Sequence, residues 1–226
     1  MSDIFREVEE DVRREQLKKL WDRYGIVVIA VAALIVLGTA GWRGWQWYSE
    51  RQAAALGAEY YEAVQLARDQ PSEAEAAFNE IAAKGGGFAA LARLRAAAAR
   101  AEGGDLDGAV SEYDAISSGS GVQTDLRDVA RIRAGYILLQ QDDRPGVEQR
   151  VGDLAAEGNP WRNSARELLG LAAYQDGDTD TATARFEEIL GDNETPSDMR
   201  ARAQLMISLL AADRPMSSGE DAAAEQ

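Results

Sequence analysis

GDLDGAVSEY (residues 104–113) and GDTDTATARF (residues 177–186) fit one pattern, in which Gly-Asp is followed by Ala and then, four residues later, by an aromatic residue. The two alanines, Ala109 and Ala182, lie 73 residues apart, which is two periods near 36. A weaker form of the pattern occurs before and between them, so that four small or β-branched residues recur at intervals of 35, 38 and 35 residues: Ala74, Ala109, Val147 and Ala182. Ala-rich, Pro-poor segments separate these positions, and the sequence therefore predicts an all-α protein built from repeated helix pairs.

This repeat resembles the tetratricopeptide repeat, a helix-turn-helix unit of about 34 residues. A small residue lets two helices approach closely, and the aromatic residue four positions later lies on the same helix face and fills the space between successive pairs. The resemblance implies an α-solenoid of about four helix pairs, with Met199–Ala211 as a further, capping helix. Two units are degenerate: the first has Gln70-Pro71-Ser72 at its turn, and the third has Arg144-Pro145 in place of Gly-Asp. A plain helical bundle is the alternative interpretation.

Composition excludes several classes of function. The 226 residues contain no Cys and no His, which rules out thiol nucleophiles, disulfides, zinc sites with these ligands, and Ser-His-Asp triads within the chain. The net charge of −15 disfavours nucleic acid as a ligand, because phosphate binding relies on Lys and Arg. We therefore expect a protein that is not an enzyme and that needs no cofactor and no metal.

Residues 24–42, YGIVVIAVAALIVLGTAGW, contain no charged side chain. As a helix they would span about 28 Å, close to the roughly 30 Å hydrocarbon core of a bilayer. Aromatic residues suited to the headgroup region flank this stretch on both sides: Trp21, Tyr24, Trp42, Trp45, Trp47 and Tyr48. The stretch is too long, and the head before it too extended, for an ordinary cleaved signal peptide, so we interpret it as an uncleaved signal anchor. A buried core helix is the other alternative.

Charge is distributed unevenly about this anchor. Basic residues are denser before it than after it, with Lys18, Lys19 and Arg23 close to its start, which favours a cytoplasmic N-terminus. Residues 1–51 are neutral in sum, whereas residues 52–226 carry the whole charge of −15. The predicted organisation is a cytoplasmic amphipathic head (1–23), a transmembrane anchor with an aromatic rim (24–48), a periplasmic repeat domain (49–212) and a disordered acidic tail (213–226).

In tetratricopeptide repeats the first helix of each unit lines the inner face, and that resemblance implies a largely apolar groove. Its positions in this chain are Leu91, Leu94, Val129, Ile132, Tyr136, Leu139, Leu171 and Tyr174. Such a groove suits an extended or helical partner segment, although a stripe at helical spacing is more often core. Arginines also cluster on the first helices, and we expect them to form a solvated face that pairs with nearby carboxylates: Arg93, Arg95, Arg127, Arg131, Arg133, Arg162 and Arg166.

The whole arrangement resembles the ancillary SecYEG translocon subunit family of Gram-negative bacteria, with the anchor exit GWRGW (residues 41–45) as the specific cue. The resemblance implies a single-pass inner-membrane protein that contacts the Sec translocon and links exported polypeptides to periplasmic chaperones. Two alternatives remain open at this point. One is a tetratricopeptide scaffold for envelope or cell-division assemblies, and the other is a regulator that acts on a cytosolic partner through its head.

Overall fold

The computed structural model describes the backbone of residues 3–213 and the side chains of residues 18, 21–27 and 29–212. The chain divides into two compact units, Met1–Ala55 and Leu56–Gln226. Across the described backbone there are α-helices, one short 3-10 helix and no β-strand, so the all-α prediction is confirmed. In chain order the helices are α1 (Asp3–Leu66), α2 (Pro71–Ala83), α3 (Ala89–Glu102), α4 (Leu106–Ser117), α5 (Thr124–Gln140), α6 (Arg144–Val151), the 3-10 helix η1 (Gly152–Ala155), α7 (Arg162–Gln175), α8 (Thr179–Gly191) and α9 (Ser197–Asp213).

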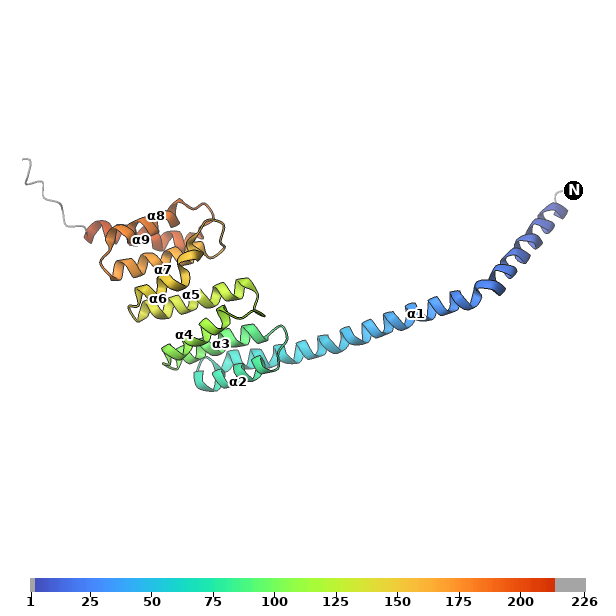
Figure 1. Ribbon diagram of the computed structural model, residues 1–226, viewed down its shortest axis with the longest axis horizontal. Helices are drawn as coiled ribbons and strands as arrows, with labels where there is room; N and C mark the ends of the chain where they lie inside the picture. The colour runs from blue at the N-terminus through green and yellow to red at the C-terminus, as the bar shows by residue number, and fades with distance from the viewer. Residues whose placement is uncertain (1–2, 214–226) are drawn as a thin grey trace, which may run out of the picture. The chain divides into compact units, whose positions relative to one another are not determined.

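The second unit is a solenoid of four helix pairs followed by one helix. The last turns of α1 pack against α2 through a shared apolar cluster, and the later pairs are α3 with α4, α5 with α6 and η1, and α7 with α8. Figure 1 shows these pairs stacked in chain order, with α9 against the last pair. Each helix contacts chiefly its neighbours along the chain, as expected of a repeat protein. The prediction of four pairs plus a capping helix is therefore confirmed.

The repeated sequence positions form the centre of this stack. The four small or β-branched positions that define the period, Ala74, Ala109, Val147 and Ala182, are all fully buried. The residues four and seven positions later are buried too, and they are Phe78, Tyr113, Val151 and Phe186 together with Ile81, Ile116, Leu154 and Ile189. Glycine in the first helix permits the close approach: a Cβ on Gly170 would lie 3.1 Å from the Phe186 ring, and one on Gly135 would lie 3.2 Å from Val151.

An aspartate begins the second helix of three units. The carboxylates of Asp105, Asp143 and Asp178 accept hydrogen bonds from backbone N–H groups three residues later, at 2.9–3.1 Å, as N-caps do. Gly104 and Gly177 precede two of these caps with positive φ. The interpretation that the third unit lacks this turn is wrong, because Asp142, at φ 56°, takes the glycine's place and Asp143 caps the helix. Aspartate tolerates the left-handed region better than most residues, which is why the turn survives without glycine.

The N-terminal compact unit, outside the repeats, contains the apolar stretch of α1. From Trp21 onward this helix is long and apolar enough to cross a membrane, and almost none of its most apolar stretch is buried against protein. All six predicted interface residues are exposed, with exposed fractions between 51% and 66%: Trp21, Tyr24, Trp42, Trp45, Trp47 and Tyr48. The Arg51 guanidinium lies 4.0 Å from the centroid of the Trp47 ring, a cation–π contact at the charged border of the segment. The backbone of residues 3–23 is helical as expected, and the tail residues 214–226 lie outside the described residues.

Replacing Phe186 with Ala tests the packing between units. The ring is 1% exposed and covers Gly170, so its removal leaves a cavity, and we expect the free energy of unfolding to fall by about 3–5 kcal/mol. Leu205→Ala is the control, because Leu205 is 69% exposed and its truncation should change stability by less than about 0.5 kcal/mol. Urea denaturation of both full-length variants in detergent, followed by circular dichroism, compares them. An equal loss of unfolding free energy in the two variants would contradict the packing of Phe186 between helices.

Candidate functional site

A pocket opens on the first helices of three successive units. Its volume is about 320 Å³. Tyr60 contributes from the end of α1, and the Tyr113 side chain enters from α4. The remaining lining residues come from α3 and α5: Leu91, Leu94, Arg95, Ala98, Glu102, Leu126, Val129 and Arg133. The pocket thus depends on the stacking of units rather than on any single helix pair.

Deeply buried side chains form the floor of this pocket, and exposed ones form its rim. Leu94 is 9% exposed and Tyr113 is 3% exposed, whereas Leu91 is 37% exposed. Tyr60 is held by ring contacts with Phe78 and Phe88, at centroid distances of 5.5 and 5.6 Å. Burial raises the pKa of the Tyr113 phenol, so this side chain stays neutral at physiological pH. The floor is therefore a preformed, uncharged surface.

The rim of the pocket carries two arginines and one glutamate. Neither Arg95 nor Arg133 forms an ion pair with a carboxylate in the described part of the chain. Arg95, Glu102 and Arg133 line the same pocket as Tyr113. An apolar floor with polar groups at its edge is the usual form of a binding site.

Three of the predicted groove residues line this pocket, others belong to the core or pack on it, and Leu94 does both. Leu91, Leu94 and Val129 line the pocket together. Ile132 is 5% exposed and belongs to the core, against which Leu139 also packs. Leu171 and Tyr174 pack on the separate cluster formed by α7, α8 and α9. Tyr136 is 41% exposed, and its hydroxyl donates a long hydrogen bond of 3.4 Å to Glu167.

Sequence reasoning missed half of the pocket. Neither Tyr60 nor Tyr113 is among the predicted groove positions, because those positions begin at Leu91, after Tyr60 in the first unit, and Tyr113 belongs to a second helix. The expectation that the first-helix arginines pair with carboxylates holds for Arg131, Arg162 and Arg166. It is wrong for Arg93, Arg95, Arg127 and Arg133, none of which forms an ion pair with a carboxylate among the described residues. Helical spacing gave the face on which each arginine lies but not the distance to carboxylates on neighbouring helices.

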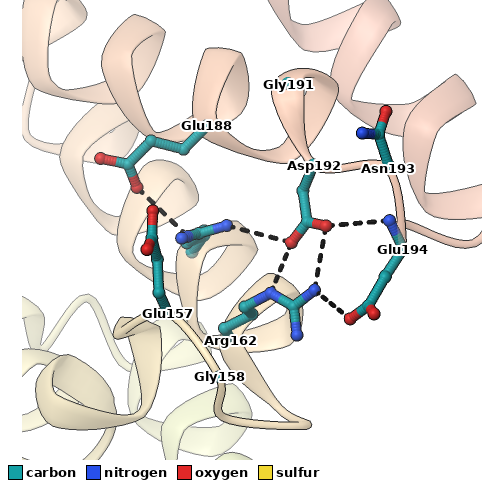
Figure 2. A pocket seen from close by; sticks show the side chains of 9 residues that line it. Glu157, Gly158, Arg162, Glu188, Gly191, Asp192, Asn193 and Glu194 are labelled. Atoms are coloured by element: carbon teal, nitrogen blue, oxygen red, sulfur yellow. Dashed lines mark hydrogen bonds and ion pairs between the residues drawn. The ribbon is translucent and has the colours of Figure 1, made fainter.

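A second pocket, of about 570 Å³, lies between α7 and the loop that follows α8, and ion pairs connect most of its charged groups, although the buried Nε of Arg166 has no hydrogen-bond partner among the described residues. Figure 2 shows the Arg162 guanidinium facing Asp192 and Glu194. It donates to both Asp192 oxygens, at 2.5 and 2.9 Å, and to Glu194 at 2.6 Å. Arg166 lies 3.3 Å from Glu188 and 3.4 Å from Asp192. Because each guanidinium already has carboxylate partners, this pocket is a polar joint between helices and not a ligand site.

Other ion pairs connect residues about one repeat apart. Arg150 binds Asp114 at 2.7 Å, and Arg144 binds Asp178 at 3.1 Å. Arg202 of α9 binds Glu167 of α7 at 2.7 Å. These pairs are separated by 34–36 residues in sequence, so each joins equivalent levels of neighbouring units. These ion pairs connect neighbouring units of the solenoid. The guanidinium groups of the three arginines therefore already have carboxylate partners.

The model of the tetratricopeptide repeat-like domain family matches residues 18–225, which cover the apolar helix and the repeats. No curated protein and no solved structure matches the chain.

The joint at Asp192 makes stability sensitive to acid. The Arg162 guanidinium, which donates to both carboxylate oxygens, holds the pKa of Asp192 well below its usual range. In the unfolded chain this carboxyl takes up a proton near pH 4, whereas in the folded protein it stays ionised. The stabilisation is therefore complete above about pH 4 and is lost as the pH falls toward the folded pKa.

We expect Asp192→Asn to be less stable than wild type at pH 7 and to lose less further stability between about pH 5 and pH 3. The control is Asp69→Asn, because Asp69 is exposed and forms no ion pair in the described chain. Urea denaturation at several pH values gives the free energy of unfolding as a function of pH for each protein. An acid dependence in Asp192→Asn as steep as in wild type would rule out the assigned role.

Proposed function

The chain belongs to the tetratricopeptide repeat-like domain family, and we propose that it is a membrane-anchored, non-enzymatic adaptor whose repeat domain binds exported polypeptides. Family membership indicates a protein–protein interaction scaffold. The observation that carries the finer proposal is the pocket on the first helices, because it gives an apolar floor where three units meet. A pocket of this kind can hold side chains of an extended segment without a nucleotide or a metal.

The apolar helix supports a location at the membrane. Its side chains between Ile26 and Leu37 are exposed wherever they are described, and water would solvate such a surface poorly. Basic residues are denser before this helix than after it, which favours an N-terminus in the cytoplasm and a repeat domain in the periplasm. A domain held at that surface would meet polypeptides as they leave a translocon.

The proposed partners are the SecYEG translocon and periplasmic chaperones. Support comes from the resemblance of the anchor exit, Gly41 to Trp45, and of the order of segments to the ancillary SecYEG subunit family. Residues 52–226 carry the net charge of −15, so an anionic membrane surface would repel the repeat domain. The domain would therefore stay accessible to partners. The adaptor role then consists of holding an apolar segment briefly until a chaperone takes it.

Topology is testable with cysteine labelling, because the chain has no Cys of its own. A cysteine at exposed Ser120 should react with a membrane-impermeant thiol reagent in Gram-negative cells whose outer membrane has been made permeable. A cysteine at Ser2 should react only after the inner membrane is broken. The cysteine-free parent chain serves as the background. Labelling of Ser2→Cys but not of Ser120→Cys in intact inner membranes would reverse the proposed orientation.

Photo-crosslinking tests the adaptor role. A photoreactive amino acid at Leu91, on the rim of the pocket, should crosslink to exported chains arrested in the translocon. The matched site is Glu148, which is exposed on α6 and does not line the pocket, and it should give few of these products. If Leu91 and Glu148 crosslink equally, or if neither captures exported chains, the repeat domain does not bind them through this pocket.

A further inference from the structure

The two arginines at the pocket mouth lack carboxylate partners although the surrounding chain is rich in carboxylates. Residues 52–226 carry almost twice as many acidic as basic side chains, and the ion pairs one repeat apart use the arginines of the other helices. Arg95 lies on α3 and Arg133 on α5, and both are exposed and line the same pocket. A guanidinium that has no carboxylate partner, in a domain with so many carboxylates, is available to a ligand.

Other arginines without a carboxylate partner do not share this position. Arg68 follows α1 in a turn, and Arg93 lies on α3, but neither lines the pocket. Arg127 donates to the Thr124 hydroxyl at 2.9 Å and also lies outside the pocket. Within the described part of the repeat domain, arginines without a carboxylate partner therefore line this pocket only at Arg95 and Arg133.

The dimensions and charge of the pocket define the ligand. A volume of about 320 Å³ is at the lower end of ligand pockets, so it accommodates one or two side chains rather than a folded element. Leu94, Val129 and Tyr113 present an apolar floor, which selects a bulky apolar side chain. Arg95 and Arg133 can each bind one carboxylate beside it, and Arg–carboxylate pairs have strong directional preference. The two guanidinium groups disfavour a ligand that carries positive charge, and the Glu102 carboxylate on the wall repels any further carboxylate beyond the two that the arginines bind.

The overall charge of the chain limits how acidic this ligand can be. A net charge of −15 repels a highly acidic partner at long range, whereas the two guanidinium groups attract carboxylates only at close range. A segment with one carboxylate on each side of an apolar residue satisfies both conditions. An anionic lipid surface is disfavoured, because the same net charge opposes its approach.

Building on the proposed function, we propose that the pocket recognises extended polypeptide segments in which a bulky apolar residue is flanked by single carboxylates. The floor binds the apolar side chain, and Arg95 and Arg133 bind the flanking carboxylates. The repeat domain would accordingly favour acidic-apolar segments over neutral or basic ones. This preference is a property of the pocket rim and does not require a free C-terminal carboxylate.

The test uses the full-length chain in nanodiscs of neutral lipid and a fluorescent peptide with Leu-Phe at its centre. One Glu stands on each side of that pair, and both peptide ends are blocked. We expect the matched peptide with Gln in place of both Glu to bind at least about fivefold more weakly, and the peptide with Lys to bind more weakly still. Fluorescence anisotropy measures all three. Equal binding of the Glu and Gln peptides, or no binding of the Glu peptide, would overturn the proposal.

Variants connect the preference to the rim. In the double variant Arg95→Gln/Arg133→Gln, the Glu peptide should bind no more tightly than the Gln peptide. The thermal midpoint should stay at the wild-type value, because neither arginine forms an ion pair within the described chain. Arg68→Gln removes an unpaired arginine outside the pocket and should leave the preference intact. A double variant that keeps its preference for the Glu peptide contradicts the assigned role.

Two further outcomes separate this inference from the function on which it rests. If crosslinks from Leu91 to exported chains persist while the Glu and Gln peptides bind equally, the adaptor role stands and the charge preference is wrong. If the preference is present but Leu91 captures no exported chain, the pocket binds such segments and the adaptor role is wrong. Vesicles of anionic lipid that compete with the Glu peptide would instead identify a lipid site and overturn the proposal.

Discussion

Burial of one apolar side chain per unit, four residues after a small or β-branched position, holds the solenoid together. Phe78, Tyr113, Val151 and Phe186 occupy equivalent places, and none is more than 3% exposed. In a repeat protein a single unit does not bury its apolar face alone, and stacking against the neighbouring units completes the burial. The spacing of the units, the close helix crossings at Gly135 and Gly170, and the pocket between α3 and α5 all follow from this packing.

The third unit has the least apolar material at its centre. Val151 stands where the other units have an aromatic ring, and α6 ends there and continues as the 3-10 helix η1. Two features compensate for the smaller side chain. Gly135 lets α5 approach Val151 directly, and Leu168 of α7 lies close to the same glycine. Arg150, the neighbour of Val151, binds Asp114 in the preceding unit.

Electrostatic pairing divides the arginines of the repeat domain into two groups. One group joins neighbouring units and is satisfied within the chain, as at Arg144, Arg150 and Arg202. The other group includes Arg95 and Arg133, which face a pocket with an uncharged floor. Exposed ion pairs contribute little stability each, so the first group matters mainly for fixing one unit against the next. The second group contributes no such contact and is free to act on a ligand.

The sequence by itself determined the helical class, the repeat period, the number of helix pairs and the presence of one apolar helix. These features depend on local spacing, in which a small residue and an apolar residue four positions later share one helix face, as at Ala182 and Phe186. The tertiary structure decided that Asp142 and Asp143 replace Gly-Asp in the third turn, because the left-handed conformation of Asp142 is a property of the folded backbone. It also decided which arginines are paired, and it brought Tyr60 and Tyr113 to the pocket of Leu91 and Leu94. Distances between side chains on different helices depend on how the units stack, and residue spacing along one helix does not contain that information.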